Sequence, residues 1–203
     1  MLLFCSIIFA QEQEDNQEND KKERKNIPAF RVGLKLGIPN GVGGNIEYVT
    51  PLLGQRIALY GDYSGISATI DDVKGKLKYF EVGTNIYIFG NSGSGFYGSI
   101  GYGDLTVDGT YSDAQTIGGE DFSGTAEGTF EVSTVNLKGG FKVGKRIYFR
   151  TELGYGFGDV PQEVVITGNV NGIPAVGVEE IPDIPGLNEN GYVLFNIGLG
   201  IAF

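Results

Sequence analysis

The amino-acid sequence predicts an all-β protein, an eight-stranded antiparallel up-and-down transmembrane β-barrel, from three observations. Apolar and polar residues alternate with a period of two in eight segments, and no stretch keeps the 3.6-residue period of a helix. Glycine supplies 34 of the 203 residues, whereas about 7% is usual in proteins. Short connections at one end and long connections at the other, between an even number of strands, are the plan of a barrel that crosses a membrane.

The first 26 residues stand apart from the alternating segments. Residues 1–10, MLLFCSIIFA, are apolar and end in a small residue, which is typical of a secretory signal peptide cleaved after Ala10. Because no positive residue lies between Met1 and the apolar run, we expect a truncated or atypical signal, and a short buried strand is the alternative. Residues 11–26 are wholly polar and predict a disordered tether. The barrel is expected to occupy residues 27–203.

The first four strands are predicted at residues 29–37, 44–51, 55–64 and 77–89. In each of them, side chains two residues apart share one face of the sheet. The residues that make the apolar faces are Phe30, Val32, Leu34 and Leu36, then Ile46 and Tyr48, then Ile57, Leu59 and Tyr63, and finally Phe80, Val82, Thr84, Ile86 and Ile88.

The other four strands are predicted at residues 95–104, 131–143, 146–158 and 191–203. Their apolar faces are Phe96, Ile100 and Tyr102, then Val135, Leu137, Phe141 and Val143, then Ile147, Phe149, Leu153, Tyr155 and Phe157, and finally Val193, Phe195, Ile197, Leu199, Ile201 and Phe203. The last strand keeps its alternation to the final residue.

The connections between these strands differ in length in a regular way. The second to third, fourth to fifth and sixth to seventh strands are joined by TPLLGQ, GNSGSG and the tight Gly144-Lys145 turn. The third to fourth, fifth to sixth and seventh to eighth strands are joined by about 12, 27 and 32 residues. Only the first link, IPNGVGG, is short on the long-loop side. Short periplasmic turns and long outer loops are therefore expected.

The polar face of the strands is expected to line the barrel interior. Eight strands leave room only for side chains, and glycines would make space for long polar ones. The charged residues of this face are Arg31, Lys35, Glu47, Arg56, Asp62, Glu81, Lys138, Lys142, Arg150 and Glu152, and its glycines include Gly33, Gly83, Gly101, Gly140, Gly154, Gly156, Gly198 and Gly200. A soluble lipocalin-like barrel, with the polar face in water, is the alternative.

Tyrosines near the strand ends are candidates for the aromatic girdles found at membrane–water interfaces. These are Tyr63, Tyr79, Tyr102, Tyr148, Tyr155 and Tyr192, although Tyr148 falls on the inward register.

The composition argues against an enzyme. The chain has no histidine, which excludes Ser-His-Asp and Cys-His nucleophiles and imidazole-based zinc sites. The glycines of GSGFYG, residues 93–98, match a dinucleotide-binding motif, but that site needs a following helix. Here another strand follows, so the segment reads as a hairpin turn. No cofactor and no resident metal site are expected.

Acidic residues concentrate in the two longest connections. The net charge is −10, and no basic stripe suits nucleic acid. Six acids lie between residues 104 and 130 and six between 159 and 190, with no Lys or Arg among them. Divalent cations could bind these loops or bridge them to anionic lipopolysaccharide. The pairs Asp71-Asp72, Glu120-Asp121 and Glu179-Glu180 read as solvated loop acids.

With its eight alternating strands and its unequal connections, the chain resembles the small OmpA/OmpX-type outer-membrane β-barrels of Gram-negative bacteria, over about residues 29–203. The resemblance implies location in the outer membrane, contact with its lipid and lipopolysaccharide, and delivery by the barrel-assembly machinery. A final strand with alternating apolar residues and a terminal aromatic is the family's assembly signal. Here it would comprise Val193, Phe195, Ile197, Leu199, Ile201 and Phe203. A monomer is expected.

Two functions are compatible with this fold, and a third, a membrane enzyme acting on lipid, is disfavoured because the chain has no histidine. The first is a structural or surface-interaction protein, with a side-chain-filled barrel that displays acidic loops outside the cell. The alternative is a narrow pore or channel for small or apolar molecules.

Overall fold

The computed structural model describes residues 28–70, 73–89, 93–117, 120–170, 173–181 and 186–203. The proposed signal and tether, residues 1–26, therefore lie outside the described part. Eight strands make the barrel: β1 (Phe30–Ile38), β2 (Gly41–Val49), β3 (Ile57–Ile70), β4 (Val73–Phe89), β5 (Gly95–Ile117), β6 (Glu120–Gly144), β7 (Ile147–Phe157) and β11 (Gly191–Ala202). The 3-10 turn η1 (Leu52–Gly54) follows β2, and β8 (Glu163–Val170), β9 (Ile173–Glu180) and β10 (Leu187–Asn188) lie between β7 and β11.

Backbone pairing closes the eight strands into a ring. Each barrel strand is antiparallel to the next from β1 to β7, β7 pairs with β11, and β11 pairs with β1. At the seam, Phe30 N donates to Phe203 O at 3.1 Å and Phe203 N donates to Phe30 O at 2.9 Å. The predicted eight-stranded antiparallel barrel is confirmed. Among the described residues, no helix is long and apolar enough to span a membrane.

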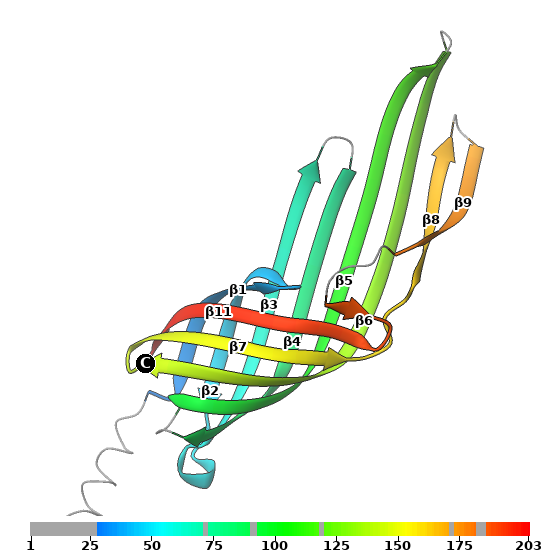
Figure 1. Ribbon diagram of the computed structural model, residues 1–203. Coiled ribbons are helices and arrows are strands. Elements are labelled where there is room, and N and C mark those ends of the chain that lie inside the picture. Colours follow the sequence, from blue (N-terminus) through cyan, green and yellow to red (C-terminus); the bar gives the residue numbers. More distant parts are fainter. Residues whose placement is uncertain (1–27, 71–72, 90–92, 118–119, 171–172, 182–185) are drawn as a thin grey trace, which may run out of the picture.

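The long connections differ from the expected loops, because most of their residues extend the strands. The β3–β4 ladder continues to the Ile70/Val73 pair, and the β5–β6 ladder continues to the Ile117/Glu120 pair. The third connection folds into the β8–β9 hairpin, whose β8 pairs with β6. Figure 1 shows these hairpins projecting beyond one end of the barrel. We call the outer parts of β3, β4, β5 and β6 (residues 66–78 and 104–132), together with β8 and β9, the outer sheet.

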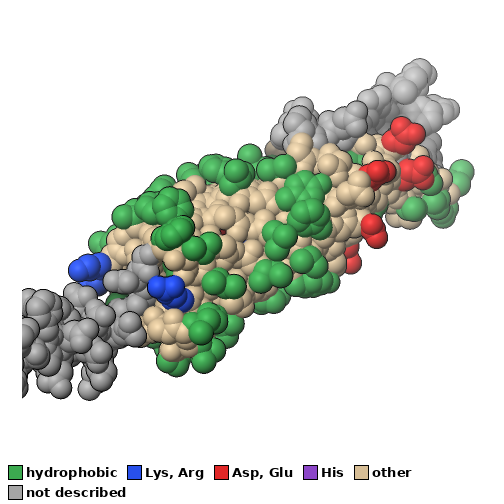
Figure 2. All heavy atoms as spheres, turned by 60° about the horizontal axis from the view of Figure 1, so that its bottom comes forward, with side chains coloured by type: hydrophobic (Ala, Val, Ile, Leu, Met, Phe, Trp, Pro, Cys, Tyr) green, Lys and Arg blue, Asp and Glu red, His purple; other side chains and the backbone are tan. Residues whose placement is uncertain are grey.

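The barrel is apolar outside and polar inside. Side chains such as Leu34, Ile100 and Leu199 are exposed on its outer surface, whereas Glu81, Asn136 and Asn196 are fully buried. Figure 2 shows hydrophobic side chains over the visible face of the barrel, with Lys and Arg at one end and Asp and Glu toward the other. The basic end carries the short turns, where Arg56, Lys145 and Arg146 are exposed. A soluble barrel would have the opposite polarity.

The apolar phase of the strands switches at the base of the outer sheet. On β5, the apolar residues Ile100 and Tyr102 face outward on the barrel. Farther along the same strand, the apolar residues Leu105 and Val107 lie on the inner face. On β4, Phe80 and Val82 face outward, whereas Leu77 packs inward. In the outer parts of β4, β5 and β6, polar side chains occupy the outward face. The alternation continues with its phase shifted by one residue, which is why an unbroken apolar face ends at these points in the sequence.

Tyrosine rings fill the space that interior glycines leave. The Tyr60 hydroxyl lies over Gly101, where an added Cβ would stand 2.4 Å from it. Across from Tyr97, a Cβ on Gly140 would stand 2.3 Å from the Tyr97 Cζ. Two of the predicted girdle tyrosines, Tyr79 and Tyr192, also point inward and are 1% and 2% exposed, so their assignment to a girdle was wrong.

Their neighbours explain that correction. Tyr79 and Tyr192 lie where the inner face becomes apolar, and they pack there with Leu105, Val132 and Leu194. Tyr148 is buried, as its register indicated, whereas Tyr63 and Tyr102 are exposed on the outer surface.

Gly140→Ala should destabilise the barrel by about 1–3 kcal/mol, because the rigid Tyr97 ring leaves no room for a methyl group. Gly139→Ala is the matched control, since a Cβ on this adjacent glycine would meet nothing within 4 Å. Urea unfolding in detergent micelles, followed by circular dichroism, measures both. Equal loss of stability in the two variants would contradict the packing described here.

Candidate functional site

The barrel interior holds a network of buried charges. Glu47 is its first centre: Arg31 Nη1 lies 2.7 Å from Glu47 Oε1, and Lys142 Nζ lies 2.5 Å from Glu47 Oε2. Asn85 Nδ2 donates to the same carboxylate at 2.8 Å, and the Tyr87 hydroxyl donates at 3.0 Å. One carboxylate thus accepts hydrogen bonds from four side chains, which offsets the cost of removing its charge from water.

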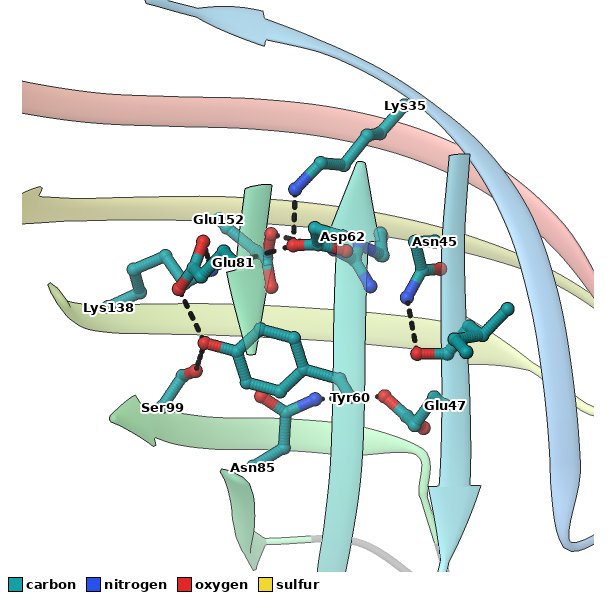
Figure 3. Close-up of polar contacts among 12 residues, drawn as sticks. Lys35, Asn45, Glu47, Tyr60, Asp62, Glu81, Asn85, Ser99, Lys138 and Glu152 are labelled. Atoms are coloured by element: carbon teal, nitrogen blue, oxygen red, sulfur yellow. Dashed lines mark hydrogen bonds and ion pairs between the residues drawn. The ribbon is translucent and has the colours of Figure 1, made fainter. Parts of the chain in front are cut away.

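Asp62 and Glu81 form the second centre, drawn in Figure 3. They face each other in adjacent strands, and Lys138 Nζ lies between them, 2.8 Å from Glu81 and 3.8 Å from Asp62. Lys35 forms a short ion pair with Asp62. The hydroxyls of Tyr60 and Tyr79 donate to the two oxygens of Glu81 at 2.5 and 2.7 Å. The lysines therefore separate two carboxylates that would otherwise repel.

Arg150 and Glu152 link the network to β7. Arg150 Nη2 lies 2.9 Å from Glu152 and 3.6 Å from Asp62. The Tyr97 hydroxyl donates to Glu152 at 2.8 Å from β5, two strands away, across Gly140 of β6. These contacts join strands that are not neighbours, so the network ties opposite walls of the ring together.

Of the ten charged residues predicted for the interior, nine lie there. Arg56 is the exception and is exposed. The reason is its position: β3 begins one residue later, at Ile57, so Arg56 belongs to the turn after η1. Its backbone carbonyl accepts from Tyr87 N at 2.8 Å, and its backbone N donates to Leu52 O at 3.3 Å. Among the described residues, five buried cations thus face four buried carboxylates.

The tyrosines of the network were missed as site residues. Tyr60, Tyr87 and Tyr97 are each at most 5% exposed, and each donates to a buried carboxylate. A signal for them was present in the sequence, because each lies on the polar face of its predicted strand. Tyrosine is amphipathic, so its residue type alone does not distinguish an interior position from a girdle.

Apolar layers lie on both sides of the charged network. Toward the outer sheet, buried side chains pack into one cluster: Tyr79, Leu105, Val132, Val160, Tyr192 and Leu194. Toward the short turns, a second cluster contains Val49, Ala58, Tyr87 and Tyr97. Buried hydrophobic side chains thus border the charged network at both ends, and Tyr87 and Tyr97 belong to both.

The outer sheet carries charges of opposite sign on different strands. Its outward face holds exposed Lys74, Lys76 and Lys78 on β4, and the acids Asp104, Asp108, Glu127 and Glu131 on β5 and β6. The lysine series was not singled out from the sequence, although its spacing of two is visible there. No group of three acids, His or Cys able to hold a metal ion occurs among the described residues.

Several acids of the loops suggested for cation binding are outside the described part of the chain. Asp71 and Asp72 fall outside the described residues, and the side chains of Glu120, Asp121 and Glu179 are not described. Cation binding stays a prediction. The six residues of the predicted assembly signal all face outward and are exposed, and their role in assembly likewise stays a prediction.

No family model and no curated protein matches the sequence. Three solved structures are similar. CarO of Acinetobacter baumannii is 15% identical, with 87% of this chain and 98% of that chain covered and a TM-score of 0.48. The N-terminal barrel of Pseudomonas aeruginosa OprF is 16% identical, with 86% and 95% covered and a TM-score of 0.40. The NalP autotransporter translocator domain of Neisseria meningitidis is 11% identical, with 96% and 97% covered and a TM-score of 0.31.

The closed ring of eight antiparallel strands decides the fold. The chain folds as a small, closed, eight-stranded antiparallel β-barrel. In such a barrel, the number of strands fixes how much the interior can hold, and here that space is occupied by the paired charges and tyrosines described above.

Glu81→Ala should cost about 3–5 kcal/mol of stability, because it leaves Lys138 buried without its nearest carboxylate. Arg56→Ala is the matched control and should leave stability unchanged, because its side chain is in solvent. Heat-dependent gel migration and urea midpoints in micelles compare the two. A Glu81→Ala barrel as stable as the Arg56→Ala barrel would show that the interior network does not hold the ring together.

Proposed function

We propose that this chain is an outer-membrane protein whose filled barrel anchors a surface-exposed acidic sheet and serves a structural or surface-interaction role. The phase switch of the strands carries this proposal. Below the switch, the outward side chains suit hydrocarbon, and above it they suit water. In a protein surrounded only by water, the apolar residues would stay on the same face along the whole strand.

Lipid contact accounts for the apolar outer surface. Contiguous apolar patches of more than a few hundred Å² are rare on soluble monomers, yet exposed aliphatic and aromatic side chains occur on all eight barrel strands. Outer-membrane lipid and lipopolysaccharide are the surroundings that fit this belt and the polar face above it. The seam between β1 and β11 leaves no open sheet edge at the level of the belt, as lipid requires.

The packed interior favours an anchor over a pore. Ions would have to separate carboxylates from their cations and displace the apolar layers at both ends. Removing one partner of a buried pair costs several kcal/mol, so spontaneous opening would be rare. The narrow channel for small or apolar molecules, the alternative expected from the sequence, receives no specific support from this arrangement.

In planar lipid bilayers, the purified full-length chain should show no stable open-channel steps, because paired charges and apolar clusters block the interior. Regular, long-lived conductance steps would contradict the anchor function. Heat-modifiable migration of the same preparation provides the control that the barrel is folded. Recovery of the protein in a soluble fraction, without heat modification, would overturn the membrane assignment itself.

A further inference from the structure

Two edges of the outer sheet have no strand paired to them among the described residues. One row of paired residues crosses the whole outer sheet: Thr69, Lys74, Thr110, Glu127, Thr167 and Val176. At one side, β2 follows β3 only as far as the Val42/Gly65 pair, so residues 66–70 have a strand neighbour on one side. At the other side, β9 pairs with β8 alone among the described strands. Exposed strand edges are templates for pairing with another chain.

We propose that these two edges bind each other between copies of this chain, so that β9 of one copy pairs with the outer part of β3 of the next. The proposal rests on the proposed function, because copies inserted in one membrane share the same orientation. In that orientation β3 runs away from the barrel, whereas β9 returns toward it (Figure 1). A β9–β3 contact is therefore antiparallel and continues the pattern of the sheet.

The same reasoning disfavours a symmetric contact. Two β9 strands related by an axis along the membrane normal would run parallel, in a sheet whose pairs are all antiparallel. An antiparallel β9–β9 pair would require the two barrels to be inverted in the membrane. The arrangement is thus heterologous: each copy uses its β9 edge for one neighbour and its β3 edge for the other.

Charge separation across the outer sheet supports a second copy as the partner. The β3 side carries exposed Lys74, Lys76 and Lys78 on the adjacent strand β4. The β9 side ends in Glu180, which the register sets directly opposite Glu163 of β8. Like charges opposed in this way destabilise a strand pair. Lysines of a neighbouring sheet, one strand beyond the contact, would offset that repulsion.

Spacing in the membrane permits the contact. Six strands about 4.8 Å apart make a sheet at most ~29 Å wide. Eight strands tilted by about 40° form a ring ~16 Å across the backbone, and packed sheets stand ~10 Å apart, so touching barrels would have centres ~26 Å apart. The sheet can therefore span from one barrel to the next. Pro174 lacks a backbone donor, and Gly65 already pairs with Val42. With Thr69 opposite Val176, the contact is therefore limited mainly to residues 176–179, where Val176 and Val178 are 73% and 59% exposed.

Chemical crosslinking in outer membranes tests the contact. The full-length chain would carry Thr69→Cys and Val176→Cys, with Cys5→Ser to remove the native thiol, and a short bis-maleimide would tolerate a small register shift. We expect a ladder of dimers and larger multimers on denaturing gels. The single-cysteine variants should remain monomeric, because a heterologous contact brings together two different positions.

Two controls make the result decisive. A Thr69→Cys, Lys145→Cys variant, with its second thiol in an exposed turn at the opposite end, measures chance collision and should give no ladder. Combined Lys74→Glu, Lys76→Glu and Lys78→Glu changes should lower the multimer yield several-fold at low salt. Dimers from a single-cysteine variant, or no ladder above the collision control, would overturn the proposal and restore the monomer expected from the sequence.

Heat-modifiable migration of the same membrane samples separates the two proposals. Loss of the ladder with intact heat-modifiable barrels refutes only the contact between copies. Absence of the protein from the membrane fraction refutes the proposed function on which that contact depends.

Discussion

The narrow interior of an eight-stranded ring is the constraint on which the rest of this structure depends. An apolar outer surface leaves the inner face of the strands to carry polar side chains, and the ring has little room for water. Each buried carboxylate must therefore find cations and hydroxyls on facing strands. Glu81, which accepts from Lys138, Tyr60 and Tyr79, shows how one residue meets this requirement.

Glycine and tyrosine solve the resulting packing problem together. A long charged side chain and a phenol ring fit side by side in the narrow interior only where the neighbouring strand has a residue without a side chain. Gly140 provides such a position for Tyr97, whose hydroxyl then reaches Glu152 on the next strand beyond. The high glycine content and the buried charges thus have one cause, which is the small cross-section of the barrel.

The sequence contained most of the barrel because period-two alternation is strongest where the two faces differ most in polarity. It did not reveal the outer sheet, because the apolar phase shifts there by one residue, as between Tyr102 and Leu105. Arg56 was predicted to face inward only because it is an even number of residues from Asp62. This alternation does not apply to Arg56, because β3 begins one residue later. Tyr79 and Tyr192 were placed in a girdle because their residue type suits both an interface and a buried polar network. Which side chains meet in the interior depends on the pairing of strands far apart in the sequence. The alternation of residues and their type do not reveal that pairing.

The phase switch links the fold to its proposed setting and can be examined along a single strand face. Spin labels at outward positions 100, 102, 106 and 108 of β5 would report accessibility to oxygen, which partitions into lipid, and to a water-soluble nickel complex. We expect oxygen to reach labels at Ile100 and Tyr102 and the nickel complex to reach labels at Thr106 and Asp108. The change from oxygen to nickel access should fall between Tyr102 and Thr106. Equal nickel access at all four positions in the folded barrel would contradict a lipid-facing belt that ends at the base of the outer sheet.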